Sequence, residues 1–310
     1  DLVHDLFIEG YGQNEEDEQE ELKRYNIHPQ ARVVYNRQQV QIAPYDRQFG
    51  SKTILQRAAT IFAGPLANFI LAFVILVGFS LYTGSPVNII DTVIPDMAAE
   101  KAGLEPGDRI VAIDNQKINS WKDLSEKISM SPNKELLFQI ERNGHQLAIP
   151  VTPIGEENPL AEGELRGYIG VTPVFQRSLL GAIDYGWDMT VDFTTLIFKS
   201  IGLLLTGGVS IDDLSGPVGI IDYTGQMAQE GLPVLLRWTA LISINLAIFN
   251  LLPIPALDGG RLMFIALEAI RGRPIDPQKE SLVHFIGFAL LMLLILVVTW
   301  NDIQRVFLNN

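Results

Sequence analysis

The 310-residue chain contains no cysteine and little charge. Without cysteine it can form neither a disulfide bond nor a cysteine-ligated zinc site. The absence of cysteine also does not indicate whether the protein works in an oxidising or a reducing compartment. Charged residues make up 19% of the sequence, and the formal net charge is −13. No basic patch is present, so a nucleic-acid partner is not expected, because such a partner requires concentrated Lys and Arg.

Hydrophobic residues make up 47% of the sequence and gather in three long stretches. Residues 59–82 and 285–300 contain no charged side chain, and residues 238–257 are apolar apart from two asparagines and small hydroxyl residues. A helix of about 20 apolar residues crosses the hydrocarbon core of a bilayer. The sequence therefore predicts a polytopic α-helical membrane protein with three transmembrane helices, rather than a large soluble core.

Basic residues indicate the orientation of these helices, because Lys and Arg favour the cytoplasmic side. Arg47, Lys52 and Arg57 directly precede the first stretch, and four further basic residues lie between the second and the third. Both groups place residues 1–57 and 258–281 in the cytoplasm. The segment between the first two spans is then expected outside the membrane.

The region after the first span has the pattern of a compact α/β module. Asn143-Gly144 predicts a hairpin turn because both residues readily adopt a positive φ, and Ser120 is a plausible N-cap. Residues 154–167 are polar and are expected to form a loop. The expected strands are 87–94, 110–113, 136–141, 146–151 and 168–174, and the expected helices are 97–103 and 121–129.

Residues 178–206 are amphipathic and carry four charged side chains. These charges count against a transmembrane helix, so an interfacial helix or helix pair is expected here. The charged residues are Asp184, Asp188, Asp192 and Lys199.

The most informative segment is residues 250–260, NLLPIPALDGG. A carboxylate such as Asp258 costs about 2.5–3.5 kcal/mol at the centre of a membrane helix. Pro253 and Pro255 each remove a backbone donor, so the helix must break there. Because non-helical backbone at membrane depth requires protein or water around it, the segment predicts a polar intramembrane pocket. The alternative is a helix that ends at the interface, with Asp258 capping the next one.

Four motifs resemble those of the site-2 protease family, and they occur in the family's order. Residues 250–261 (NLLPIPALDGGR) resemble its NxxPxPxLDGG signature, and residues 63–69 (AGPLANF) resemble its AGPxxNF motif. Residues 98–113 are similar to the signature of bacterial PDZ domains, and residues 215–220 (SGPVGI) to the stretch that precedes the aspartate-bearing helix. The resemblance covers nearly the whole chain. It is to the bacterial enzymes of regulated intramembrane proteolysis that carry one PDZ domain.

The resemblance implies an intramembrane zinc metalloendopeptidase of the bacterial plasma membrane, with an extracytoplasmic PDZ domain inserted between spans. Its expected substrates are single-span membrane proteins such as anti-sigma factors, already shortened by an upstream site-1 protease. Asp258 would be the third zinc ligand, beside which Gly259 and Gly260 let the backbone turn closely. Asn250 is expected to contact the substrate or the oxyanion, with the pairing of a freed carbonyl as an equal alternative. Asn68 is expected to pack between helices, as part of the motif set that includes Pro253 and Pro255.

One departure from the family is large. Its first helix carries His-Glu-x-x-His, which supplies two ligands and the general base, and no histidine of this chain has another four residues on. The four histidines (His4, His28, His145 and His284) are expected to be exposed or structural. Because catalytic zinc needs three protein ligands, this chain alone is expected to be inactive, with the missing helix lost upstream of Asp1. A non-catalytic, membrane-tethered PDZ adaptor and part of a transporter with a broken helix remain alternatives.

The expected organisation has seven segments. They are a cytoplasmic polar region with a β-hairpin (1–57), a span with the AGPLANF motif (58–83), the PDZ domain and following strand (84–175), an amphipathic membrane-associated region (176–234), a span with the NLLPIPALDGG motif and a cytoplasmic loop (235–281), the last span (282–304), and a tail (305–310).

Overall fold

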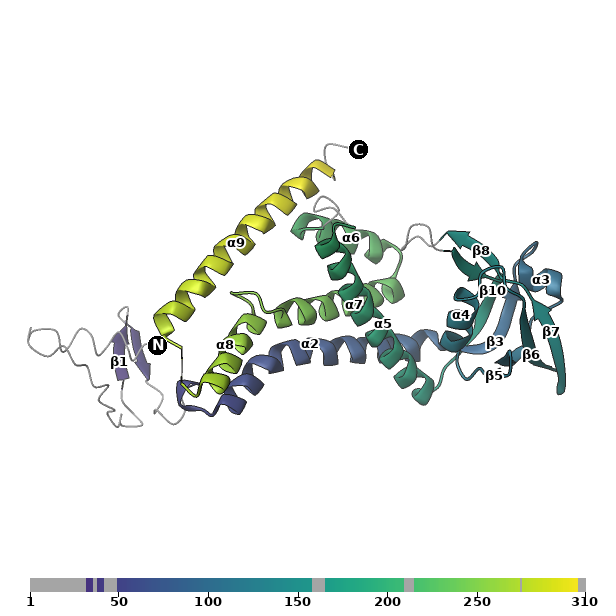
Figure 1. Cartoon of the computed structure of the whole chain (residues 1–310), viewed down its shortest axis with the longest axis horizontal. Helices are drawn as coiled ribbons and strands as arrows, with labels where there is room; N and C mark the ends of the chain where they lie inside the picture. The colour runs from purple at the N-terminus through teal and green to yellow at the C-terminus, as the bar shows by residue number, and fades with distance from the viewer. Residues whose placement is uncertain are drawn as a thin grey trace, which may run out of the picture. The chain divides into compact units, whose positions relative to one another are not determined.

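The computed structural model describes residues 32–35 and 38–41 by their backbone, and residues 49–157, 165–208, 215–273 and 275–305. Figure 1 shows the helices and strands in their order along the chain. The chain divides into two compact units, of which one comprises Asp1–Ala67 and Ala247–Leu296, and the other comprises Asn68–Leu246 and Val297–Asn310.

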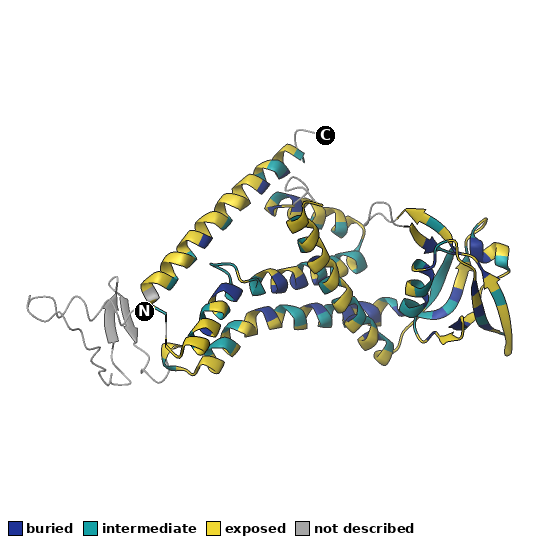
Figure 2. Cartoon of the chain, viewed as in Figure 1, coloured by how far each residue is buried: buried dark blue, intermediate teal, exposed yellow. Residues whose placement is uncertain are grey.

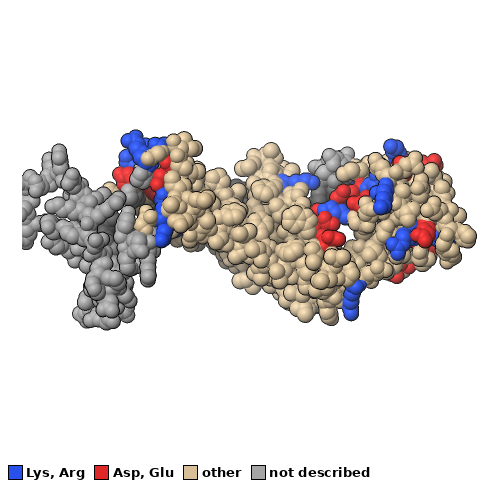
Figure 3. All heavy atoms as spheres, turned by 90° about the horizontal axis from the view of Figure 1, so that it is seen from below, with Lys and Arg blue, Asp and Glu red and all other residues tan. Residues whose placement is uncertain are grey.

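Four helices of the described residues are long and apolar enough to cross a membrane, by length and composition. They are α2 (Ile54–Thr83), α5 (Leu179–Thr206), α7 (Leu232–Leu251) and most of α9 (Pro277–Ile303). Their apolar side chains are largely exposed (Figure 2), as expected where lipid rather than protein covers them. On the face in view in Figure 3, broad areas of the surface carry no Lys, Arg, Asp or Glu. The described residues therefore contain four candidate spans, one more than the three that the sequence predicts.

The additional candidate is α5, expected to lie at the interface as a helix or helix pair. It is one uninterrupted helix with a mean hydropathy of 1.4 in its most apolar window. Its charges do not all face lipid, because Asp188 and Asp192 pair with Lys122. Both aspartates lie in the first half of the 28-residue helix, and their pairing with Lys122 reduces the cost of the two charges, because charged side chains in membrane helices are tolerated where they find a partner.

The second unit contains a six-stranded antiparallel sheet with the strand order β10-β3-β4-β6-β7, in which β5 also pairs with β4. The β6–β7 hairpin turns at Asn143 (φ 51°) and Gly144 (φ 79°), as the Asn-Gly pair predicts. The strands are β3 (Ser85–Val93), β4 (Arg109–Ile113), β5 (Gln116–Lys117), β6 (Leu136–Arg142), β7 (His145–Val151) and β10 (Val171–Gln176).

Two helices accompany this sheet, α3 (Ala98–Ala102) and α4 (Trp121–Ser129). The Ser120 side chain accepts the Asp123 N–H and the Asp123 carboxylate accepts the Ser120 N–H, which makes a capping box at the start of α4. Apolar side chains from sheet and helices form one buried core that includes Ile110, Leu124 and Phe138. The sheet and its helices therefore have a hydrophobic core of their own.

A buried ion pair closes one end of this core. The fully buried Asp108 carboxylate accepts hydrogen bonds from Arg142 Nε at 2.6 Å and Nη2 at 2.7 Å, and from the Glu105 N–H at 2.9 Å. These hydrogen bonds to Asp108 raise the pKa of Arg142 above its usual value. With its oxygens satisfied, the Asp108 carboxylate tolerates complete burial.

A short hairpin interrupts the segment expected to be a loop. Strand β8 (Ile154–Glu157) pairs with β9 (Leu165–Tyr168) in antiparallel register. The expectation of a loop over 154–167 is therefore wrong at both ends of that segment. Its polar, Gly-containing strands lack the apolar alternation by which strands are recognised.

The start of α6 (Pro217–Gln229) is anchored by the end of α9. Asp302, fully buried, accepts the Gly219 N–H at 2.8 Å and pairs with Arg305 at 2.9 Å. A Cβ added at Gly216 or Gly219 would approach an Asp302 oxygen to 2.9 Å. The glycines of the SGPVG segment therefore let a helix start directly against a carboxylate from elsewhere in the sequence.

The first unit brings together the start of α2, the end of α7, α8 (Asp258–Arg271) and the first part of α9. Arg57 in α2 pairs with Glu268 in α8 at 2.5 Å, and both side chains are largely buried. In the same unit β1 (Arg32–Tyr35) and β2 (Gln38–Gln41) pair as an antiparallel hairpin. The Arg57–Glu268 pair ties α8, the helix that begins with Asp258, to α2.

Candidate functional site

The backbone breaks between α7 and α8, where the two prolines predict a break. Helix α7 ends at Leu251, and α8 begins at Asp258. Between them the chain folds through tight turns, in which the Ile254 N–H donates to the Leu252 carbonyl at 2.7 Å and the Leu257 N–H donates to the Ile254 carbonyl at 3.2 Å. Residues 252–257, here called the break loop, therefore satisfy several of their own backbone groups instead of continuing the helix.

Gly259 and Gly260 are buried and lie against the break loop. A Cβ at Gly259 would overlap the carbonyl oxygens of Leu251 and Leu252. A Cβ at Gly260 would lie 2.5 Å from the Ile254 carbonyl oxygen. Because these neighbours are backbone atoms, they cannot move aside as a side chain would. The two glycines therefore allow the first turn of α8 to fold back onto the loop, and so fix where Asp258 stands.

Asp258 occupies the first position of α8 and is half-buried. A Cβ added at Gly64, in the AGPLANF motif of α2, would lie 3.6 Å from Asp258 Oδ2, so this glycine leaves space beside the carboxylate. Within the part of the chain that the structure describes, no side chain forms a hydrogen bond or ion pair with the Asp258 carboxylate. The Asp258 carboxylate oxygens are therefore available to coordinate a metal ion.

The Asp258 carboxylate fits one ligand position of a zinc site. A carboxylate oxygen is an ordinary zinc ligand, but a catalytic zinc takes three protein ligands and one open position. The described residues contain no group of three or more His, Cys, Asp or Glu side chains that could hold a metal ion. Asp258 alone thus meets the chemistry of one ligand.

Helix α9 supports the break loop at two points. The Ala256 N–H donates to His284 Nδ1 at 2.8 Å, and Ala256 adopts a left-handed backbone conformation with φ 79°. One helical turn later, a Cβ at Gly287 would lie 2.5 Å from Pro255 Cβ and 2.6 Å from its carbonyl oxygen. The sequence predicted a structural or exposed His284, and the structure gives it a structural contact. Gly287 and the strained Ala256 carried no sequence signal that identified them.

The remaining predicted site residues lie on the helices around the break. Asn250 is half-buried in the last turn of α7, and no described residue hydrogen-bonds its side chain. Pro253 is exposed, and Pro255 packs against Gly287. Asn68, in the second unit, contributes its backbone carbonyl, which accepts a hydrogen bond from Ser243 Oγ at 2.9 Å. This contact between α2 and α7 uses the Asn68 backbone, and the packing role expected of the Asn68 side chain stays a prediction.

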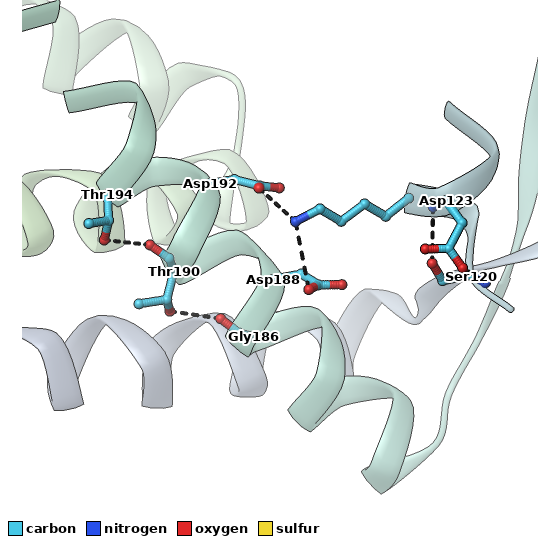
Figure 4. A network of polar contacts seen from close by, with 8 residues as sticks. Ser120, Asp123, Gly186, Asp188, Thr190, Asp192 and Thr194 are labelled. Carbon is cyan, nitrogen blue, oxygen red and sulfur yellow. Dashed lines mark hydrogen bonds and ion pairs between the residues drawn. The ribbon is translucent and has the colours of Figure 1, made fainter. Parts of the chain in front are cut away.

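A second polar cluster joins α4 of the sheet domain to α5 within the second unit (Figure 4). The Lys122 ammonium lies 2.7 Å from Asp192 Oδ1 and 3.7 Å from Asp188 Oδ1. Partial burial disfavours the charged form of Lys122. The hydrogen bond to Asp192 and the charges of both aspartates outweigh that effect, so the pKa of Lys122 is raised. This contribution to stability is present below the usual lysine range and is lost only as pH rises through the raised pKa.

Comparison with known proteins gives a consistent result along the whole chain. The model of peptidase family M50 matches residues 7–294. The zinc metalloprotease RasP of Geobacillus kaustophilus is 48% identical over 310 residues, and the regulator of sigma-W protease RasP of Bacillus subtilis is 46% identical over 312. Each alignment covers 99% of this chain and 72% of the relative.

More distant similarity extends to other bacteria. The probable protease eep of Enterococcus faecalis is 38% identical, again over 99% of this chain and 72% of its own length. A solution structure of GtR34C from Geobacillus thermodenitrificans is 26% identical over 26% of this chain and 90% of its own, with a TM-score of 0.21, too low to indicate a shared fold. The chain belongs to peptidase family M50, the site-2-type zinc metalloproteases, and with its apolar helices it is a multi-pass membrane protein.

Proposed function

We propose that this chain supplies the aspartate ligand and the substrate-gating module of an intramembrane zinc endopeptidase. Its substrates are single-span membrane proteins of the anti-sigma-factor class, cut within the membrane after a site-1 protease has shortened them. The observation that carries this proposal is Asp258, a half-buried carboxylate without a partner among the described residues, which begins α8 directly after the proline break that follows the candidate span α7. A relative named as a regulator of sigma-W protease supports the substrate class.

In this proposal the residues beside the break loop hold the metal and orient the substrate. Zinc, when bound, lowers the pKa of a coordinated water and polarises the scissile carbonyl. Asp258 holds one coordination position, and Gly64 leaves space beside it. The Asn250 amide, unpaired among the described residues, donates a hydrogen bond to the unwound substrate strand or to the developing oxyanion. The other two ligands and the general base belong to a His-Glu-x-x-His helix, which is not found in these 310 residues.

The zinc content of two preparations tests this proposal. The complete gene product should bind stoichiometric zinc and cleave a model single-span substrate in detergent or liposomes. The 310-residue chain, purified in the same way, should retain almost no zinc and show no cleavage, because one carboxylate cannot hold the metal. Stoichiometric zinc on the 310-residue chain would contradict the assignment of the other ligands. A complete gene product without His-Glu-x-x-His would favour the membrane-tethered adaptor, the second candidate function.

We further propose that the sheet domain, residues 84–175, is an extracytoplasmic PDZ domain that excludes substrates not yet shortened. Two features support a gating role. Strand β10 is an edge strand of the sheet, to which an extended peptide could add. Lys122 ties α4 to the candidate span α5 through Asp188 and Asp192, so the domain has a defined attachment to the membrane part of its unit.

Deleting residues 87–153 from the complete gene product should allow cleavage of the unshortened substrate while cleavage of the shortened one persists. The charge-reversal variant Lys122→Glu should relax the exclusion partly, because it turns two attractions into repulsions without removing the domain. The measurement is the ratio of cleavage rates for the two substrates, with Lys117→Glu, on the short strand β5, as a matched control. An unchanged ratio in the deletion variant would rule out the filter.

A further inference from the structure

The break loop carries backbone strain directly before Asp258. Ala256 is two residues upstream of the carboxylate and has φ 79°. For an L-residue with a Cβ, this left-handed region is higher in free energy than the right-handed helical region. Such a conformation persists only where the surroundings fix it. The neighbours of Ala256 therefore decide whether Asp258 keeps its place.

One neighbour makes a directed contact with the strained residue. His284 Nδ1 accepts the Ala256 N–H at 2.8 Å, across 28 positions of sequence. An imidazole nitrogen that accepts carries no proton, so this hydrogen bond assigns the neutral ring with its proton on Nε2. The His284 ring also packs on Phe264 of α8, with ring centroids 5.5 Å apart. His284 thus bridges the residues on both sides of Asp258.

The other nitrogen of the ring is not used. His284 Nε2 is buried and has no hydrogen-bond partner among the described residues, and the nearest carboxylate oxygen, Glu280 Oε1, is 3.9 Å away. A leucine of similar size would satisfy packing without leaving this group unpaired. The directed bond to Ala256 is therefore what a histidine contributes here and an apolar residue would not.

A second contact on the same helix holds the preceding residue. Gly287 lies three positions after His284 and packs so closely on Pro255 that a Cβ would reach the proline ring and carbonyl. Helix α9 thus holds Pro255 by steric contact and Ala256 by a hydrogen bond. The two contacts limit the movement of the chain that leads into Asp258.

We propose that His284 is a positioning residue for the active centre: by accepting the Ala256 N–H it locks the strained turn that aims the Asp258 carboxylate at the metal. This inference rests on the proposed role of Asp258 as a zinc ligand. His284 itself touches neither substrate nor metal in this account. It acts through the geometry of residues 255–258.

The test compares His284→Leu with His284→Asn in the complete gene product. Leucine removes the acceptor, whereas an asparagine side-chain oxygen lies near the place of Nδ1 and can accept the same N–H. His284→Leu should release zinc to a chromophoric chelator roughly tenfold faster, the factor that corresponds to about 1.4 kcal/mol, and should lower kcat with little change in KM. His284→Asn should restore most of both values. Phe285→Leu, at an exposed neighbouring position of α9, is the matched control.

Two further variants keep the outcomes distinct. Gly287→Ala should accelerate zinc release with His284 intact, since it disturbs the same loop from the second contact. If Asp258→Ala abolishes zinc retention but His284→Leu does not change it, the positioning role is wrong and the ligand assignment stands. If Asp258→Ala retains zinc, the proposed function fails. If asparagine performs no better than leucine, the hydrogen bond is not the cause.

Discussion

Asp258→Ala in the complete gene product should abolish both zinc retention and intramembrane cleavage. Loss of a residue that merely orients a ligand already costs roughly 10–100-fold in metal affinity or activity. Removal of a direct ligand should therefore reduce cleavage by more than about a hundredfold. Asp258 is suited to this role because its carboxylate is half-buried and, among the described residues, unpaired. Alanine should therefore leave no uncompensated partner behind, and the fold should survive.

The assay is metal analysis of the purified protein together with cleavage of a single-span substrate. Asp258→Glu keeps the charge but extends the side chain by one methylene, so it should retain part of the zinc and little activity, because catalytic geometry tolerates small displacements poorly. Asp184→Ala, an exposed aspartate of α5, provides the control. Full cleavage by Asp258→Ala would remove the carboxylate from the mechanism altogether.

Gly259→Ala should reduce cleavage by at least about tenfold, although it introduces only one methyl group. That group would overlap the carbonyl oxygens of Leu251 and Leu252, which belong to the backbone at the helix break. Overpacking of this kind typically costs about 1–3 kcal/mol, and more where no side chain can move aside. The first turn of α8 must then shift, and Asp258 shifts with it.

Gly202→Ala is the matched control, because a Cβ at Gly202 in α5 meets nothing within 4 Å. Cleavage rate, zinc content and thermal unfolding of both variants should be measured side by side. We expect Gly259→Ala to lose at least about tenfold in cleavage and to unfold at lower temperature, with Gly202→Ala unchanged in both. Equal behaviour of the two variants would show that the close approach at Gly259 has no functional consequence.

The sequence predicted those parts of the structure that short-range patterns encode. The N-cap at Ser120 and the Asn143-Gly144 turn appear where expected, since each is set by residues within a few positions of one another. The break after Leu251 also follows from local chemistry, because two prolines cannot continue a helix. The family, too, was recognised from motifs and is confirmed by the comparisons.

What the sequence missed depends on contacts between distant residues. Helix α5 was excluded as a span because of its aspartates, yet two of them pair with Lys122, which lies more than sixty positions earlier. The hydrogen bond from the Ala256 N–H to His284 joins the break loop to α9, and it leaves no periodic signal in the sequence. Hydrophobic periodicity reports which face of an element is buried, but not which partner buries it.

The anchoring of α6 by Asp302 has a practical consequence for preparing this protein. Because the buried carboxylate that holds the Gly219 N–H comes from the end of α9, a clone that stops before residue 302 would free a helix start located more than eighty positions upstream. Affinity tags are better attached after the last residue than substituted for the final turn. A truncation chosen for convenience at that terminus would be read, wrongly, as a defect of the SGPVG segment.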